Sequence, residues 1–224
     1  MRSGSKRIAA RPPELAAWQL RTLDAVASSA LEREVVFGGG AALAALHLHH
    51  RVSEDVDFFA ERQIEPTELA PLARALSHRR TTCEIEVVGP RTSLLLVGPT
   101  AMVGRVDFAF YPFDPVGRRA KWRGLRVESL EDMTVNKVQA VLTREQPRDF
   151  VDLYFLLQEG PLRDLGEILA LLRAKFDAGP HPMGLAARLL LVREMRQLPR
   201  MIRRVTHRQL VVFFEQRARE LVRQ

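Results

Sequence analysis

The chain has 224 residues, 46% of them hydrophobic and 27% charged, which suits one sizeable globular domain or two small ones and excludes a disordered or fibrous protein. No apolar run approaches the roughly 20 residues of a membrane-spanning helix, and the basic N-terminal segment lacks the apolar stretch of a secretion signal, so we expect a cytoplasmic protein without a membrane partner. The single cysteine, Cys83, excludes an internal disulfide and a cysteine-based zinc site.

The net charge of +7 comes from the C-terminal part of the sequence. Residues 161–224 contain 13 Lys and Arg against 6 Asp and Glu, whereas residues 1–160 contain 21 of each. A basic region of this kind attracts a polyanion such as RNA, because phosphate neutralisation dominates non-specific nucleic-acid binding. Solvated helix faces in an arginine-rich protein would give the same charge, so both interpretations stand.

The first part of the chain alternates predicted helices and strands. Apolar residues three or four positions apart predict a helix over residues 12–31. A short β-type run over residues 34–37 ends at three glycines, and an apolar helix is expected over residues 41–48. The further predicted elements are a helix over 66–78 and strands over 55–60, 83–88, 93–97, 102–111 and 125–127.

From Ser129 onwards the sequence predicts helices only. Ser129 is followed three residues later by Asp132, which is typical of a helix start. Helices are expected over 130–144, 148–158, 163–176, 183–197 and 207–222. The order of elements therefore indicates an α+β protein, with an α/β core and N-terminal helix over residues 1–128 and a helical region over residues 129–224 that carries the basic surface.

Two aspartates stand at alternate positions of one predicted strand. Asp55 and Asp57 share a face of that strand, while Val56 and Phe58 point into the core. Paired carboxylates repel each other unless a divalent cation binds between them, and Mg²⁺ commonly uses one or two carboxylates with substrate phosphates. The preceding glycine turn offers backbone N–H groups to phosphate. Either signal alone is weak, but their order predicts the two halves of a nucleoside triphosphate site.

Two ordered motifs carry a resemblance to a known family. The first is Gly-Gly-x-Ala-Leu over residues 39–43, followed by Arg-x-Ser-x-Asp-x-Asp-Phe-Phe over residues 51–59. The second is Lys-x-x-Ala-x-x-x-Arg over residues 137–144, followed by Arg-Asp-x-x-Asp-Leu-Tyr over residues 148–154. The constellation resembles the minimal nucleotidyltransferases with a polymerase β-like core and, more closely, the AbiEii/AbiGii-type nucleotidyltransferase toxins, over about residues 35–158.

The resemblance implies a mixed-sheet nucleotidyltransferase core followed by a helical region that completes the active site. It implies transfer of a nucleoside monophosphate from an NTP to a hydroxyl group of RNA, at the acceptor end of a tRNA, by a toxin with a cognate antitoxin or a role in phage defence. The expected catalytic residues are Asp55, Asp57, Asp107 and Lys137, and the three aspartates would hold two Mg²⁺ ions. The expected nucleotide-binding residues are Gly39, Gly40, Ser53, Lys137 and Arg144, supported by Arg51, Arg148, Asp149 and Asp152.

Several alternatives stay open at this stage. Asp107, which shares a strand face with Arg105, also fits the ordinary polar face of a half-exposed strand. An interhelical salt-bridge set joining Arg148 to Asp152 would explain the second motif without a catalytic role. His47, His49 and His50 fall in a predicted helix, where alternate positions diverge, so a zinc site is not expected there.

The function also has two rivals. The acceptor could be a small molecule such as an aminoglycoside, or a protein hydroxyl, although the basic helical region argues against a small acceptor. The chain could instead be a degenerate nucleotide- or RNA-binding module, because Ala41 or Gly40 replaces the hydroxyl residue that usually follows the glycine pair. The presence of all three aspartates and Lys137 argues against that loss of activity.

Overall fold

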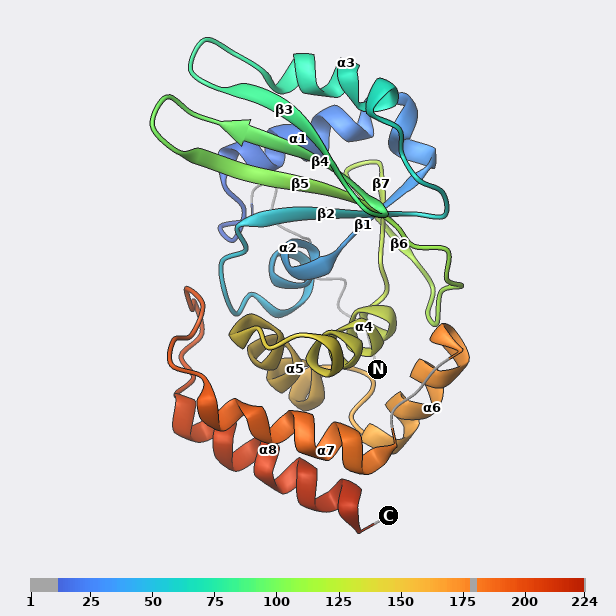
Figure 1. Cartoon of the computed structure of the whole chain (residues 1–224), viewed down its shortest axis with the longest axis vertical. Coiled ribbons are helices and arrows are strands. Elements are labelled where there is room, and N and C mark those ends of the chain that lie inside the picture. The colour runs from blue at the N-terminus through green and yellow to red at the C-terminus, as the bar shows by residue number, and fades with distance from the viewer. Residues whose placement is uncertain (1–11, 178–180, 224) are drawn as a thin grey trace, which may run out of the picture.

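The computed structural model describes residues 12–177 and 181–223, and these residues form a seven-stranded sheet with helices on it and beside it (Figure 1). The strand order is β3-β4-β5-β2-β1-β7-β6. The sheet is mixed, because β1 pairs antiparallel with β2 while β2 and β5, and β1 and β7, are parallel. The strands are β1 Val35–Gly38, β2 Asp55–Ala60, β3 Thr82–Val88, β4 Arg91–Val97, β5 Met102–Phe110, β6 Ala120–Trp122 and β7 Leu125–Val127. The predicted α+β fold with a mixed sheet is therefore confirmed.

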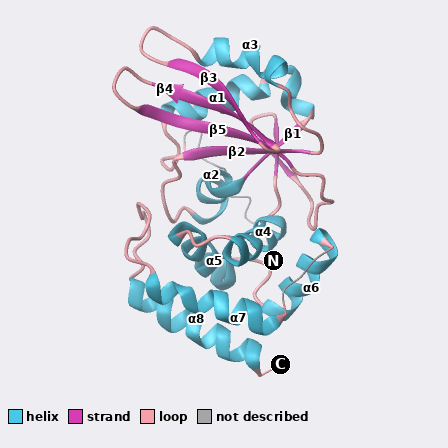
Figure 2. Cartoon of the chain, in the orientation of Figure 1, coloured by secondary structure: helices cyan, strands magenta, loops and turns pink. Residues whose placement is uncertain are grey.

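The helices divide between the two ends of the molecule (Figure 2). Three belong to the sheet half: α1 Ala17–Ala27, α2 Gly39–Leu43 and α3 Pro66–Leu76. Five gather at the other end: α4 Leu130–Thr143, α5 Pro147–Glu159, α6 Leu165–Phe176, α7 Pro182–Leu190 and α8 His207–Val222. Helix α2 packs on β2 and also reaches α4, so the glycine turn at its start lies where the two halves meet.

One hydrophobic core runs through both halves. On β2, Val56 and Phe58 are fully buried in it, and the Phe58 ring stacks on Phe108 of β5. On the opposite face, Asp55 and Asp57 are only half-buried. The predicted alternation along this strand is therefore confirmed, and the core anchors the strand whose other face carries the candidate carboxylates.

Two predicted helices have different bounds in the structure, and one strand was not predicted. The N-terminal helix begins at Ala17, not residue 12, and a separate 3₁₀ turn follows over Ala30–Arg33. The helix predicted over 183–197 ends at Leu190 with a 3₁₀ turn to Glu194, because the residues after it pair with the segment before β2 through an Arg51–Met201 bridge. Strand β6, with only three residues, was not predicted.

The helix after the glycines starts two residues earlier than expected and ends at the expected residue, Leu48. It begins at Gly39, and its last turn, Ala44–Leu48, is π-helical. His49 has a positive φ of 51°, which ends the helix. The placement of His49 and His50 in a helix is therefore wrong, and His50 leaves the helix to enter the protein interior.

Within the two described ranges, no helix combines the length and the apolar character needed to cross a bilayer.

Candidate functional site

The three candidate carboxylates meet on neighbouring strands. In the parallel pairing of β2 with β5, Asp55 lies opposite Arg105 and Asp57 lies opposite Asp107. Since alternate residues of a strand share a face, all four side chains lie on the face away from the core. The three aspartates line one cavity of about 180 Å³ together with Gly40, Arg51, Ser53, Lys137, Arg144 and Arg148. We call it the aspartate cavity, and it unites the predicted residues of both sequence motifs.

Two of the three carboxylates already have cationic partners. The Arg105 guanidinium lies between them, with Nη2 at 3.2 Å from Asp55 Oδ2 and Nε at 3.1 Å from Asp107 Oδ2. Arg148 Nη1 is 3.5 Å from Asp55 Oδ2, and the buried Ser93 hydroxyl donates a hydrogen bond of 2.7 Å to Asp107 Oδ1. Asp107 is thus buried and fixed in orientation, which does not fit an ordinary half-exposed polar face.

Asp57, the third carboxylate, is half-buried in the wall of the aspartate cavity. Within the described part of the chain its side chain makes no ion pair or hydrogen bond. Removal from water and the neighbouring Asp107 carboxylate raise the pKa of Asp57 above its ordinary value. The turn packs directly on it, since a Cβ atom on Gly39 would lie 2.2 Å from Asp57 Oδ2, and Gly39 has a φ of +64°. Only glycine fits at this position.

The chemistry of these residues fits divalent cations. Carboxylate oxygens are the ligands that Mg²⁺ prefers, and a cation beside Asp57 would relieve the repulsion from Asp107 that raises its pKa. Among the described residues, no three acidic, histidine or cysteine side chains already converge on one point. Asp55 pairs instead with the guanidinium groups of Arg105 and Arg148, and Asp107 pairs with that of Arg105.

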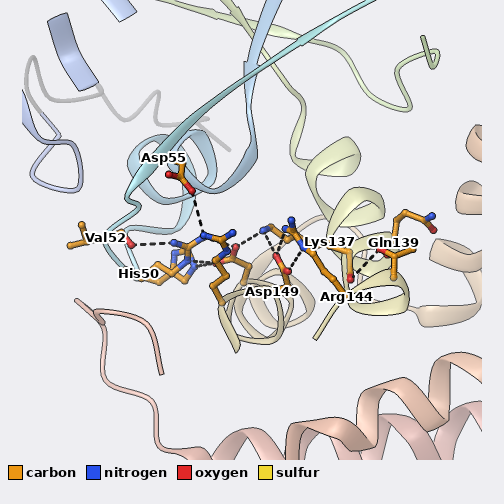
Figure 3. A network of polar contacts seen from close by, with 12 residues as sticks. His50, Val52, Asp55, Lys137, Gln139, Arg144 and Asp149 are labelled. Carbon is orange, nitrogen blue, oxygen red and sulfur yellow. Dashed lines mark hydrogen bonds and ion pairs between the residues drawn. The ribbon is translucent and has the colours of Figure 1, made fainter. Parts of the chain in front are cut away.

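A second cavity of about 310 Å³ adjoins the aspartate cavity. The two share Gly40, Asp57, Lys137 and Arg144 as lining residues. Aromatic side chains form its far wall, where Tyr111 packs against Phe113 and Phe176, and we call it the tyrosine cavity. The Gln139 side chain also lines it and points away from the neighbouring ion pairs (Figure 3). An aromatic wall next to cationic and glycine residues suits a nucleoside triphosphate.

Sequence reasoning missed Glu128, which lies buried at the base of the tyrosine cavity. Its carboxyl group accepts hydrogen bonds from the Gly39 backbone N–H and from Asn136 Nδ2. Asn136 in turn accepts a hydrogen bond from the Tyr111 hydroxyl. Glu128 therefore holds the glycine turn in place, and an acid at the end of a predicted strand, directly before a helix cap, was the signal available in the sequence.

Glu128 is expected to make stability depend on pH. Removal from water raises its pKa to about 7 from the ordinary 4.5. Between these values the unfolded chain loses the proton while the folded protein keeps it, so stability falls as the pH rises through this range, by up to about 3 kcal/mol. In urea titrations from pH 4 to 8, the Glu128→Gln variant should lose less stability than the wild type. Parallel curves for the two proteins would contradict this role.

A buried ionic network connects the two sequence motifs (Figure 3). Lys137 Nζ lies 2.7 Å from an oxygen of Asp149 and 2.7 Å from an oxygen of Asp152. Arg51 donates two hydrogen bonds to Asp152, of 2.6 and 2.8 Å, and His50 Nε2 lies 2.7 Å from the same carboxylate. These side chains come from α4, α5 and the segment before β2, so the network joins the helical half to the sheet half.

The network differs from one alternative that the sequence left open, a salt bridge that joins Arg148 to Asp152. Asp152 pairs with Arg51, His50 and Lys137, and no ion pair or hydrogen bond joins Arg148 to Asp152 in residues 12–177 or 181–223. Burial by itself raises the pKa of Asp152, but the charges of Lys137 and Arg51 hold it well below its usual range. Asp152 is therefore ionised, and it orients the Lys137 ammonium at the border of the two cavities.

The remaining predicted residues are placed as follows. Arg144 Nε lies 2.7 Å from Asp149 Oδ2 while its half-exposed side chain lines both cavities. Ser53 is buried in the wall of the aspartate cavity, and a Cβ atom on Gly40 would lie 3.2 Å from its hydroxyl. His49 contacts Glu14 at 2.8 Å. All twelve predicted site residues thus line the two cavities or belong to the network, with Gly39 in the tyrosine cavity.

Comparisons with known proteins bear on the family and the fold of the chain. The family described as "Nucleotidyl transferase AbiEii toxin, Type IV TA system" matches residues 21–218. The crystal structure of JHP933 from Helicobacter pylori is similar with a TM-score of 0.58 and 17% identity, over 92% of this chain and 89% of that one. MenT4, a nucleotidyltransferase toxin from Mycobacterium tuberculosis H37Rv, is similar with a TM-score of 0.56 and 15% identity, over 92% and 84%. No significant match was found among curated proteins.

Proposed function

The chain belongs to the AbiEii nucleotidyltransferase toxin family, and from this premise we propose that it transfers a nucleoside monophosphate from an NTP to a hydroxyl group of RNA, at the acceptor end of a tRNA. The nucleotidyltransferase activity follows from the family, whereas the RNA acceptor is our proposal. A toxin of this family implies an antitoxin partner. The basic charge of residues 161–224 supports a polyanionic acceptor.

The main support for this proposal is the position of Asp57. Asp57 lines both the aspartate cavity, which holds the other two carboxylates, and the tyrosine cavity, which has the size and walls for a nucleotide. A triphosphate in the tyrosine cavity would bring its phosphates to Gly39, Gly40 and Lys137. The reacting phosphate would then lie next to Asp57.

Each residue of the aspartate cavity that was expected to be catalytic has a role in this reaction. Asp55, Asp57 and Asp107 would hold two Mg²⁺ ions, which when bound activate the acceptor hydroxyl and stabilise charge on the departing pyrophosphate. The acceptor oxygen forms a bond to the α-phosphorus, the bond to the β-phosphate oxygen breaks, and the acceptor proton passes to Asp107. Lys137 and Arg144 supply fixed positive charge next to the phosphates.

We also propose that two regions of the chain have different roles in the reaction. Residues 1–128, of which residues 1–11 lie outside the described ranges, would form the nucleotidyltransferase core. Residues 129–224 would complete the active site with Lys137 and Arg144 and provide the basic surface.

The test is transfer of α-labelled ATP, GTP, CTP and UTP, each with Mg²⁺, to total RNA. The expected result is label on RNA of tRNA size, absent when EDTA replaces Mg²⁺ and absent in an Asp55→Ala/Asp57→Ala variant. Label on a protein or on an added aminoglycoside, with none on RNA, would refute the RNA acceptor and keep the chemistry. Label on no acceptor would favour a module that binds nucleotide without transferring it.

A further inference from the structure

A third cavity adjoins the aspartate cavity on another side. It has a volume of about 270 Å³ and shares Arg51 and Arg148 with the aspartate cavity. Among the described residues it has no lining residue in common with the tyrosine cavity. We call it the arginine cavity, because Arg200 joins the two shared arginines in its wall, next to Gln146, Gln197 and one acidic residue, Glu54. The aspartate cavity therefore borders both of the other cavities, through different lining residues.

The outer wall of the arginine cavity is an extended segment between α7 and α8, residues 195–204, which we call the strap. Figure 1 shows this orange segment rising from the helical end toward the loop before β2. It is pinned there by backbone hydrogen bonds: Val52 N–H donates to the Arg200 carbonyl at 2.9 Å, and Ile202 N–H donates to the His50 carbonyl at 2.9 Å. The strap is thus a fixed part of the site.

One arginine of the strap is used for this anchoring and the others are available. Arg203 forms an ion pair with Glu159, and its guanidinium lies 4.5 Å from the Phe155 ring centroid. Arg196, Arg200 and Arg204 are exposed, and within the described ranges their side chains make no ion pair or hydrogen bond. Three guanidinium groups of the strap are therefore exposed to solvent, and one of them, that of Arg200, lines the arginine cavity.

We propose that the arginine cavity binds a backbone phosphate of the acceptor RNA strand, with Arg148 and Arg200 as its ligands. This rests on the proposed function, because it places the acceptor of the same reaction. In phosphoryl-type transfer the attacking and leaving oxygens lie roughly in line, so the acceptor enters opposite the departing pyrophosphate. With the triphosphate in the tyrosine cavity, the arginine cavity is left for the acceptor, because among the described residues it borders the aspartate cavity through Arg51 and Arg148 and shares no lining residue with the tyrosine cavity.

The chemistry of the wall favours a polyanionic strand over a small acceptor. Arginine pairs with phosphate through two parallel N–H groups, and Gln146 and Gln197 add neutral hydrogen-bonding groups for sugar or phosphate oxygens. The exposed Arg196 and Arg204 extend the positive charge along the strap beyond the cavity, which a single small molecule would not need. A strand with several phosphates would contact all of them.

The experiment compares Arg200→Glu and Gln197→Glu with a matched control, Arg74→Glu. Arg74 is an exposed arginine on α3, at the far end of the molecule in Figure 1. The probe is a fluorescent RNA hairpin with a single-stranded 3′ end, with binding followed by anisotropy at several salt concentrations, and KM is measured for RNA and for NTP. Both strap variants should weaken RNA binding and raise the KM for RNA by about 10-fold or more, with a shallower salt dependence. The KM for NTP and the control should stay as in the wild type.

The outcomes separate this proposal from the proposed function. If the wild type labels RNA but both strap variants keep its KM for RNA, the arginine cavity is not the acceptor site, while the function stands. If Arg74→Glu weakens binding as much as Arg200→Glu, only the overall charge matters, and the assignment is equally refuted. If the wild type neither binds nor labels RNA and labels a protein instead, both proposals are refuted.

Discussion

Replacing Asp57 with asparagine is expected to lower the rate of nucleotidyl transfer by at least about 1,000-fold and at the same time to make the protein more stable. The loss of rate follows from the position of Asp57, which is the carboxylate shared by the aspartate and tyrosine cavities. The gain in stability follows from its raised pKa, because removal from water and the Asp107 carboxylate both disfavour the charged form. Asparagine keeps the shape and removes that charge.

The sign of the stability change depends on pH. A carboxyl group whose pKa is raised by folding destabilises the protein at neutral pH, and this effect fades as the pH falls toward the ordinary value of 3.8. At pH 8 the Asp57→Asn variant should melt higher by roughly 3 °C for each kcal/mol regained, and at pH 4 the difference should disappear. Calorimetry at both pH values, with the label-transfer assay, measures the two effects together.

The matched control is Asp114→Asn, which removes one carboxylate from an exposed loop position. It should change neither the transfer rate nor the melting temperature. An Asp57→Asn variant that keeps its activity would remove Asp57 from the reaction. A variant that melts lower than the wild type would show that the Asp57 charge has a partner that stabilises it.

Short-range patterns were sufficient to predict which strand face carries the carboxylates. The two-residue repeat of β2 placed Val56 and Phe58 in the core and Asp55 and Asp57 opposite them, and the structure confirms it. The same repeat placed Asp107 on the outer face of β5 together with Arg105. Such a pattern depends only on neighbours in sequence, so it can be read without knowledge of the fold.

Contacts between distant segments could not be predicted in this way. The pairing of Asp57 with Asp107 depends on a parallel register between β2 and β5, which are separated in the chain by α3 and by β3 and β4. The contact of His50 with Asp152 joins residues 102 positions apart and requires the left-handed turn at His49. The local pattern favoured a helix at His49 and His50, but contacts with distant segments hold these residues in a non-helical conformation.

The strap is a second case in which contacts between distant segments overrode a local pattern. The apolar spacing of residues 183–197 favours a helix, but the chain leaves it after Glu194. Its backbone groups instead bond to the segment before β2, as in the pair Val52 N–H to the Arg200 carbonyl. Hydrogen bonds to a distant segment take the place of helical ones, and they bring Arg200 into the wall of the arginine cavity.

The second large effect concerns Asp152, whose replacement by asparagine is expected to destabilise the protein by about 3 to 5 kcal/mol. The carboxylate is fully buried and is the common partner of His50, Arg51 and Lys137. An amide has no charge to balance Arg51, which is 3% exposed, so the variant would leave a buried guanidinium without its counter-ion. For a chain of this length, such a loss lowers the melting temperature by roughly 10 °C.

Urea unfolding of Asp152→Asn against Glu220→Gln checks this expectation. Glu220 pairs with Arg217 at 2.9 Å on the surface of α8, and loss of such an exposed pair should change stability by less than about 1 kcal/mol. Because Asp152 also orients Lys137, the variant should lose transfer activity even at 15 °C, where it is still folded. An Asp152→Asn variant as stable as the control would contradict this expectation. It would show that the buried network does not stabilise the contact between the helical half and the sheet half.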